Sequence, residues 1–263
     1  QVDRMSALHV EGLGYSAGGR ALVTDASFAL QPGSFTMLIG PNGSGKTTLI
    51  RLALGLLKPD TGTARLAGED VQRLSMRQRA LRAAYLPQSR PLAWPQPVID
   101  LVALGRFAYG GGPGRLAGDD AIAVEKAVAA CRLQPLLHRS ADTLSGGELA
   151  RVHLARAMAT EAPLIVADEP AAALDVRYQH EVMQLFANAT GAGRAVLAVV
   201  HDLTLAARYA DRLIWMSEGH IVADGTPADT MTAERLRSVF VVEADVAVGA
   251  SGDVSVEIAG PAA

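Results

Sequence analysis

The chain is poor in cysteine and in long apolar runs. It has one cysteine in 263 residues, Cys131. One cysteine allows no internal disulfide, which favours a reducing compartment, and we interpret Cys131 as a small apolar residue buried on a helix. No apolar run approaches the roughly 20 residues of a membrane-spanning helix, and the N-terminal residues show no apolar segment of a secretory signal. We therefore expect any membrane connection to come through a partner.

The chain also lacks a large excess of positive or negative charge. The formal net charge is -3, and there is neither a basic run nor a basic stripe interleaved with aromatic side chains. This pattern disfavours a nucleic-acid-binding role. With 49% hydrophobic and 19% charged residues, the composition is that of a globular protein. The length suits one large α/β domain, or a core domain with a smaller insert.

The first part of the chain carries strand and turn signals. Residues 8–30 alternate apolar and polar side chains with glycine-rich breaks, which is typical of short antiparallel strands. Residues 34–39 predict a buried strand and residues 46–57 a helix, with a glycine-rich loop between them. A turn at residues 58–62 and a short strand at residues 63–66 follow.

The pattern changes between about residues 90 and 160. Helical periodicity covers residues 98–104, 119–132 and 147–160. The glycine-rich run at residues 110–114 predicts a connection without regular structure. We expect this stretch to be a helical insert subdomain carried on an α/β core.

Strand-like runs return at residues 164–167 and 195–200, each followed by a helical segment. Such alternation predicts an α/β fold with a mainly parallel sheet and ligands at the carboxyl ends of its strands. Residues 5–240 are expected to form one domain. Residues 241–263 are expected to form a short hairpin and a loose tail.

One glycine-rich run has the full G-x-x-x-x-G-K-[ST] pattern of a phosphate-binding loop (P-loop). It reads Gly40-Pro41-Asn42-Gly43-Ser44-Gly45-Lys46-Thr47-Thr48. Glycines let backbone N–H groups turn around phosphate oxygens, and the helix beginning near Lys46 adds its partial positive end. Lys46 is expected to reach the β- and γ-phosphates, and the Thr47 hydroxyl to ligate Mg²⁺. A glycine turn with a chance Lys-Thr is disfavoured, because a strand precedes the loop and a helix follows. The chain is therefore predicted to bind and hydrolyse ATP.

Two adjacent carboxylates close a later apolar strand. Asp168 at the strand end can hold Mg²⁺ directly or through water, and Glu169 lies where a base could polarise a water in line with the γ-phosphate. Alone, Asp-Glu-Pro after a strand is more often a solvated turn. Beside a phosphate-binding loop, the functional interpretation is favoured.

A signature run narrows the prediction to a family. It reads Leu144-Ser145-Gly146-Gly147-Glu148. With Asp168 and Glu169 following after one helix and one strand, the chain resembles the ATP-binding cassette (ABC) ATPases from about residue 8 to residue 240. The resemblance implies a RecA-like P-loop NTPase core with an N-terminal antiparallel β subdomain and the helical insert.

The signature run is also a helix start. Ser145 can cap a helix expected to begin at Gly147, whose glycines leave the first N–H groups bare for an anion. In the family, this run contacts nucleotide held by the other subunit, so the resemblance implies a head-to-tail homodimer with ATP at both interfaces. The plainer alternative is a capped helix whose glycines only allow close packing.

The resemblance implies roles for further residues. Tyr15 stands where an aromatic ring stacks on adenine, and Gln88 matches the glutamine that senses Mg²⁺ and the attacking water. His201 matches the histidine that hydrogen-bonds the γ-phosphate, and residues 172–175 match the loop that crosses the dimer interface. Without the family, Tyr15 would be unremarkable, Gln88 a polar loop residue and His201 a structural histidine.

The chain departs from the family pattern in two places. Many members have Thr-Ser where this chain has Ala171-Ala172, which puts interface hydrogen bonds there in doubt. Ala150 stands where many members have a glutamine, so a polar contact is not expected at that position. The groups needed for hydrolysis are all present.

The segment after Gln88 is where family members meet their membrane partner. Here it carries Trp94-Pro95 and then, over residues 98–106, Val-Ile-Asp-Leu-Val-Ala-Leu-Gly-Arg. The Val-Ala-Leu-Gly-Arg ending and residues 236–240 are similar to importers of metal chelates such as ferric siderophores, haem or cobalamin. The plainer alternative is an amphipathic helix packed on the insert.

The resemblance implies a transport motor. Two copies would bind a dimeric integral membrane permease at the cytoplasmic face of the inner membrane, and an extracytoplasmic binding protein would deliver the chelate. Another importer, an exporter, a bare nucleotide-binding regulator and a non-transport ABC ATPase stay open as alternatives. The non-transport proteins usually carry two cassettes or a long coiled-coil insert, and this chain shows neither.

Overall fold

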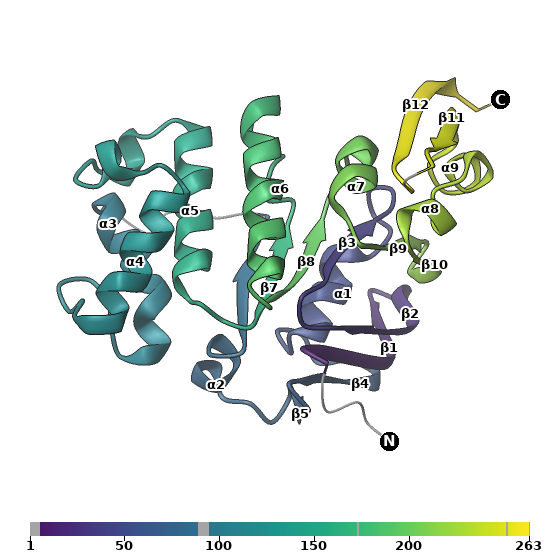
Figure 1. The fold of residues 1–263 in the computed structure, drawn as a ribbon. Helices are drawn as coiled ribbons and strands as arrows, with labels where there is room; N and C mark the ends of the chain where they lie inside the picture. The colour runs from purple at the N-terminus through teal and green to yellow at the C-terminus, as the bar shows by residue number, and fades with distance from the viewer. Residues whose placement is uncertain (1–5, 89–94, 173, 251, 263) are drawn as a thin grey trace.

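The computed structural model describes residues 6–88, 95–172, 174–250 and 252–262 (Figure 1). At its centre is a mainly parallel sheet with the strand order β10-β9-β3-β8-β7-β6. Its strands are β3 (Phe35–Ile39), β6 (Ala83–Leu86), β7 (Leu164–Asp168), β8 (Ala195–Val199), β9 (Arg212–Ser217) and β10 (His220–Gly225). Only the edge strand β10 runs antiparallel to its neighbour. Every residue of β3, β7 and β8 is buried, which is why these strands are continuous apolar runs in the sequence.

A second sheet is built from the N-terminal strands. It has the order β2-β1-β4-β5, with β1 (Leu8–Ala17), β2 (Arg20–Leu30), β4 (Thr61–Leu66) and β5 (Glu69–Asp70), all paired antiparallel. The predicted antiparallel strands are confirmed. The turn predicted through Gly62 is wrong at its end, because β4 already begins at Thr61. Gly62 has φ +79° and its Cα lies so close to β1 that a Cβ would meet the Gly12 carbonyl oxygen at 2.2 Å, so the turn-like residue serves a close backbone approach within the sheet.

Helices cover both faces of the central sheet (Figure 1). Helix α1 (Lys46–Ala53) lies between the two sheets, where its Leu49, Ile50 and Leu52 join the same apolar core as β1. Helices α6 (Val176–Gly191) and α7 (Leu203–Tyr209) pack on the other face, which is a separate core. Helix α1 ends four residues before the predicted 57. Gly55 takes φ +67°, and the Leu56 N–H donates to the Arg51 carbonyl at 2.8 Å, which closes the helix with a left-handed glycine.

The predicted helical insert is present. It contains α3 (Val98–Ala103), the 3-10 helix η1 (Leu104–Tyr109), α4 (Gly118–Ala130), the short 3-10 helices η2 (Gln134–Leu136) and η3 (Ala141–Thr143), and the start of α5 (Gly146–Ala159). Helices α3 and α4 both pack against α5. Residues 110–114 form no helix or strand, as predicted.

Several elements were not predicted. They include α2 (Met76–Ala80), α8 (Pro227–Thr230), α9 (Ala233–Phe240) and the strands β6, β9 and β10. Helix α2 has a readable signal, because Ser75 and Gln78 form a capping box around its first turn. Strand β6 is only four residues long, too short for its period to stand out.

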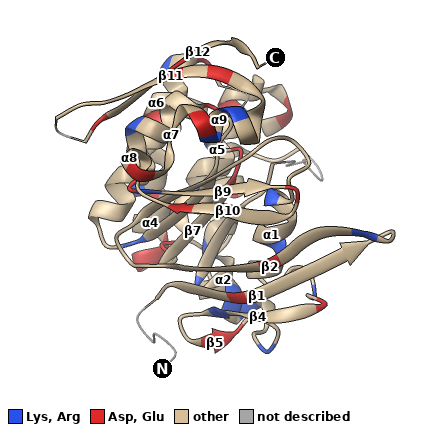
Figure 2. Cartoon of the chain, turned by 90° about the vertical axis from the view of Figure 1, so that its right-hand side faces the viewer, with Lys and Arg blue, Asp and Glu red and all other residues tan. Residues whose placement is uncertain are grey.

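The C-terminal residues form a hairpin of β11 (Val242–Val248) and β12 (Val254–Pro261). It packs on α7 and α9, and lies at the top of the view in Figure 2, where red marks acidic residues along its strands. The expected loose tail is wrong for most of its length, because pairing continues to Pro261 opposite Val242. The division of the chain into domains at residue 240 stays a prediction. Within the residues that the structure describes, no helix combines the length and apolar character that a membrane crossing requires.

Candidate functional site

The glycine-rich loop joins the carboxyl end of β3 to α1, and its glycines have different tasks. A Cβ on Gly40 would meet the Met216 carbonyl oxygen at 2.0 Å, and one on Gly45 would meet that of Leu22 at 2.3 Å. Gly43, with φ +78°, has open space around the place a Cβ would take. The sequence predicted glycines that clear a path for phosphate. Gly40 and Gly45 instead let the loop pack against neighbouring strands, and Gly43 alone of these three faces open space.

Lys46 at the start of α1 is buried in this loop. Its Nζ donates hydrogen bonds to the carbonyl oxygens of Gly40 at 2.7 Å and Pro41 at 2.8 Å. Burial lowers the pKa of this ammonium, while the nearby carboxylates of Glu169 and Asp168 act in the opposite direction. The loop's own carbonyls thus hold the charge at the place where a phosphate would lie.

Thr47 and Asp168 meet across the sheet edge. The Thr47 hydroxyl donates to Asp168 Oδ2 at 2.8 Å, and Asp168 is the last residue of β7 and fully buried. Burial raises the pKa of Asp168, partly offset by the Thr47 hydrogen bond. Its Oδ1 and the Ser44 hydroxyl are buried polar atoms that the described residues leave without a hydrogen-bond partner. A cation with its water shell would satisfy the buried Asp168 Oδ1.

Mg²⁺ at this place would be held through oxygen atoms. The donors expected from the sequence are Thr47, Asp168 and Gln88. Among the described residues, no group of three or more His, Cys, Asp or Glu side chains could hold a metal by itself. This agrees with the way Mg²⁺ binds in nucleotide sites, through few protein ligands, waters and the phosphates.

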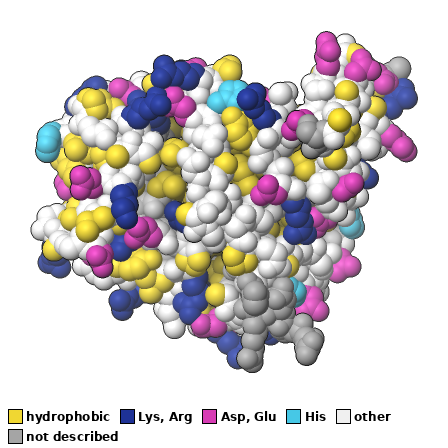
Figure 3. Space-filling view, viewed as in Figure 1, with side chains coloured by type: hydrophobic (Ala, Val, Ile, Leu, Met, Phe, Trp, Pro, Cys, Tyr) yellow, Lys and Arg dark blue, Asp and Glu magenta, His cyan; other side chains and the backbone are white. Residues whose placement is uncertain are grey.

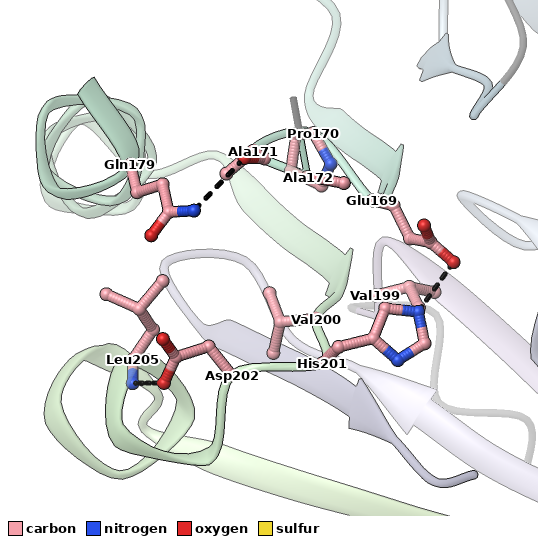
Figure 4. A pocket seen from close by; sticks show the side chains of 10 residues that line it. All are labelled: Glu169, Pro170, Ala171, Ala172, Gln179, Val199, Val200, His201, Asp202 and Leu205. Atoms are coloured by element: carbon pink, nitrogen blue, oxygen red, sulfur yellow. Dashed lines mark hydrogen bonds and ion pairs between the residues drawn. The ribbon is translucent and has the colours of Figure 1, made fainter. Parts of the chain in front are cut away.

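Glu169 joins three neighbouring strand ends. It follows β7 and accepts a hydrogen bond from Gln88 Nε2, beyond β6, at 2.7 Å. It also pairs with His201 Nε2, beyond β8, at 2.6 Å, as Figure 4 shows. The structure brings together the candidate residues Gln88, Glu169 and His201, which the sequence separates by more than a hundred positions.

Glu169 also has an unusual backbone. Its φ is +51°, in the left-handed region that a residue with a Cβ seldom adopts. This conformation costs on the order of 1 kcal/mol and persists only where surrounding contacts enforce it. The hydrogen bonds to Gln88 and His201 are such contacts, and each Glu169 oxygen keeps a second lone pair for a water.

A pocket of about 250 Å³ lies beside Glu169, between the ends of β7 and β8 and helices α6 and α7 (Figure 4). Ala171 and Ala172 line it with methyl groups, where the family pattern has hydroxyls. Gln179 on α6 donates to the Leu174 carbonyl at 3.1 Å and so ties the loop after Glu169 to the helix. Sequence reasoning missed Gln179, for which no motif gives a signal.

The signature residues lie on a different part of the molecule. Ser145 caps α5, and Glu148 completes a capping box. The helix begins at Gly146 and not at Gly147 as expected, a shift of one residue that leaves the cap in place. A Cβ on Gly147 would touch only Leu174, at 3.5 Å, and one on Gly146 would meet nothing within 4 Å.

An open pocket of about 560 Å³ borders this helix start. Its lining includes Ser145, Gly147, Glu148, Arg151 and Asp175, and no residue of the Gly40–Thr48 loop. The structure therefore does not bring the signature residues to the phosphate loop of the same chain. Within the described residues, they are two separate candidate anion-binding surfaces.

Two candidates remain less defined. Tyr15 lies on β1 opposite Val23, half-buried, and its stacking on adenine stays a prediction. Trp94 lies outside the described residues. Arg51, one turn after Thr47 on α1, adds positive charge near Asp168 and was not among the sequence candidates, although a four-residue helical spacing from Thr47 is its signal.

Comparison with known proteins agrees with this geometry. Residues 23–172 match the model of the family described as "ABC transporter". The hemin import ATP-binding protein HmuV of Thermobifida fusca is 38% identical over 89% of this chain and 82% of its own length. The cobalamin import ATP-binding protein BtuD of Halobacterium salinarum is 37% identical over 95% of this chain, and the match spans 63% of that protein.

A solved structure supports the same assignment. The ATP-binding subunit of an ABC transporter superimposes with a TM-score of 0.77 at 26% identity, over 85% of this chain and 91% of that one. The predicted α/β fold with a P-loop core is thereby confirmed. The chain belongs to the ABC transporter family and is one of its ATPases.

Proposed function

We propose that this chain is the ATPase subunit of an importer for a metal chelate, such as haem, a ferric siderophore or cobalamin. Two copies would bind a dimeric permease at the cytoplasmic face of the membrane. An extracytoplasmic binding protein would deliver the chelate to that permease. The observation that carries the proposal is that the pocket at the signature contains no residue of the Gly40–Thr48 loop. A second copy would complete each half-site. The names of the relatives in Thermobifida fusca and Halobacterium salinarum support a metal chelate as cargo.

The half-sites support a paired arrangement. The Gly40–Thr48 loop with Asp168 and Glu169 offers charge for phosphates, and the start of α5 offers bare N–H groups and the Ser145 hydroxyl. Since the pocket at α5 includes no residue of the loop, one nucleotide cannot use both within a chain. In a head-to-tail homodimer, ATP on the loop of one copy would meet Ser145 and Gly147 of the other.

Each residue of the half-sites has a chemical task in hydrolysis. The backbone N–H groups of the loop and Lys46 would hold the phosphates, and Mg²⁺ held by Thr47, Asp168 and Gln88 would neutralise their charge. Glu169 would accept the proton of the attacking water while His201 orients the γ-phosphate. The present pairing of His201 with Glu169 requires His201 to release the carboxylate when phosphate arrives.

A surface groove supports a protein partner of apolar character. It has a volume of about 540 Å³ and lies where α2 faces η1 and α5; its lining includes Met76, Tyr85 and Phe107. Met76 is 83% and Phe107 75% exposed. Figure 3 shows hydrophobic side chains on this lower left side of the molecule, between the insert and α2. Such exposed side chains around a groove are typical of docking surfaces, and a cytoplasmic segment of the permease is the proposed occupant.

Growth of cells tests the proposed cargo. A strain deleted for this chain is supplied with haem, a ferric siderophore or cobalamin as the sole source of iron or corrinoid, and complemented with the wild-type chain or with Glu169→Gln. We expect that, on one of the three chelates, the strain with the wild-type chain grows and the strains with Glu169→Gln or without the chain do not. Equal growth of all strains on all three would favour another importer, an exporter or a non-transport ATPase.

The partner is tested separately. Affinity purification of the chain from membranes should recover an integral membrane permease, and Phe107→Asp in the groove should abolish this recovery. Recovery of the chain alone or bound to nucleic acid contradicts the proposal.

A further inference from the structure

The hydroxyl of Ser145 is engaged within its own chain. Its Oγ donates to Glu148 Oε2 at 2.9 Å and accepts from the Glu148 backbone N–H at 3.3 Å. The Ser145 N–H donates to the same Oε2 at 2.8 Å. A serine hydroxyl has one proton, so Ser145 as it stands has none to offer to a phosphate.

The carboxylate that holds Ser145 is charged. The hydrogen bond from the Ser145 backbone lowers the pKa of Glu148, and the Ser145 hydroxyl and the nearby Arg139 and Arg151 act in the same direction. At neutral pH, a negative charge therefore lies beside the place where a second anion would bind. The Glu148 carboxylate and a bound anion would repel each other, and salt would weaken this repulsion because the site is open to water.

Two arginines, Arg139 and Arg151, flank the Glu148 carboxylate, and each is held in place by another contact within the chain. Arg139 Nη1 lies 3.9 Å from Glu148 Oε1, and Arg139 Nη2 donates to the Thr143 carbonyl at 2.8 Å. The Arg151 guanidinium stacks on the Tyr178 ring at 4.8 Å. Arg139 is thus placed to receive the Glu148 carboxylate once Ser145 leaves it.

We propose that Glu148 is a positioning residue that withholds the Ser145 hydroxyl from the partner's nucleotide and so raises the ATP concentration needed for pairing. The inference rests on the proposed function, in which Ser145 faces the γ-phosphate bound by the second copy. When a phosphate oxygen accepts the hydrogen bond of the Ser145 hydroxyl in place of Glu148, the Glu148 carboxylate moves toward Arg139. Glu148 therefore opposes nucleotide binding at this surface, whereas its place in the family motif implied that it binds the nucleotide.

The test compares the chain with Glu148→Gln, both carrying Glu169→Gln to prevent hydrolysis. Glutamine keeps the capping box, because its side-chain oxygen still accepts from the Ser145 N–H, but it removes the charge. Pairing is followed by analytical ultracentrifugation during titration with Mg-ATP. We expect Glu148→Gln to lower the half-point of the titration about three- to tenfold at about 0.05 M salt, and the difference to shrink at about 0.5 M salt. A purely structural cap would give no salt-dependent difference.

A second variant tests the role of Arg139. Arg139→Gln should raise the half-point where Glu148 is present and change it less where Glu148 is replaced by Gln. Equal effects in both backgrounds would mean that Arg139 acts on nucleotide directly, and would overturn the proposed exchange of Glu148 between Ser145 and Arg139.

The outcomes separate this inference from the proposed function. Pairing with an unchanged or raised half-point in Glu148→Gln overturns the role of Glu148 alone. ATP binding without pairing in every variant overturns the two-copy function itself. Circular dichroism and thermal melting of each variant verify that α5 is folded before the comparison is made.

Discussion

The two candidate anion-binding surfaces of this chain, the phosphate loop and the signature, are built in opposite ways. At the phosphate loop, residues from β6, β7, β8 and α1 converge, and Asp168 and Lys46 are buried and bonded to the chain itself. At the signature, one helix start stands open, and the places where Cβ atoms would lie on Gly146 and Gly147 are nearly unobstructed. The first surface is therefore fixed by the fold, whereas the second is left for something outside the chain. Substitutions should damage folding and chemistry at the first, and pairing at the second.

The largest effect is expected at the convergence point of the first surface. Glu169→Gln keeps the shape of the side chain but removes the base, so turnover should fall by about 10²- to 10⁴-fold while ATP still binds. Phosphate release and nucleotide binding to the same preparation measure both quantities. Near-normal turnover would remove Glu169 from the role of base.

A matched pair of glycine substitutions separates the two surfaces directly. Gly40→Ala places a methyl group 2.0 Å from the Met216 carbonyl oxygen and should lower the free energy of unfolding by about 2–3 kcal/mol. Gly147→Ala meets only Leu174 at an ordinary contact distance, so its stability should change by less than about 0.5 kcal/mol.

The two glycine variants should also differ in ATP-dependent dimerisation. Gly147→Ala should bind ATP as the wild type does but form fewer ATP-dependent dimers, because the methyl group covers the bare helix start. Thermal unfolding and sedimentation with ATP check the pair. Similar unfolding energies for both variants would contradict the contrast drawn between the two surfaces.

The buried carboxylate of the first surface predicts a pH dependence. Because burial raises the folded-state pKa of Asp168, its contribution to stability is full below about pH 4 and is lost as the pH rises through the folded value. Asp168→Asn should abolish this loss and so stabilise the nucleotide-free chain at pH 7.

The variant should also lose the stabilisation that Mg-ATP gives to the wild type. Thermal melting across pH, with and without Mg-ATP, measures both effects. A nucleotide-free Asp168→Asn chain that melts below the wild type at pH 7 would show that the Thr47 hydrogen bond outweighs the burial of the charge.

The smallest effect is expected where the first surface continues toward the second. Gln179→Leu removes the hydrogen bond to the Leu174 carbonyl, which should cost about 1 kcal/mol of stability. Turnover should fall by about two- to fivefold, because the loop between Glu169 and Asp175 is less well held. Gln184→Leu, an exposed change on the same helix, serves as the control. Equal turnover in both variants would show that the loop needs no such tie.

The sequence predicted where the residues of the first surface lie, because each of its motifs adjoins an apolar strand. The run Gly40–Thr48 and the pair Asp168 and Glu169 each lie beside an apolar strand, so their positions at the sheet edge follow from the fold class. The division of labour among the glycines did not follow, because close contacts with Met216 and Leu22 come from strands far away in the chain. The same is true of Gln179, whose partner is set by packing and not by pattern.

Some helices and strands were not predicted because their signals in the local sequence are weak. Strand β6 has four residues. Helix α9 ends at Phe240, and the capping residue after it, Val241, takes φ +57° although it is not a glycine. The hairpin of β11 and β12 was predicted from its alternation, but not its extent. The bulge between Glu243 and Ala244 shifts the register there and lets pairing reach Pro261.

The left-handed backbone of Glu169 has a consequence for anyone who engineers this chain. Glycine or asparagine would adopt φ +51° with less strain, so replacing Glu169 by either is expected to make the folded protein more robust to heat. Selection for heat resistance alone would favour such replacements, and each would delete the group on which we expect turnover to depend. A laboratory evolution scheme for this chain must therefore score ATP consumption in every round, since thermal survival and catalysis pull this one position in opposite directions.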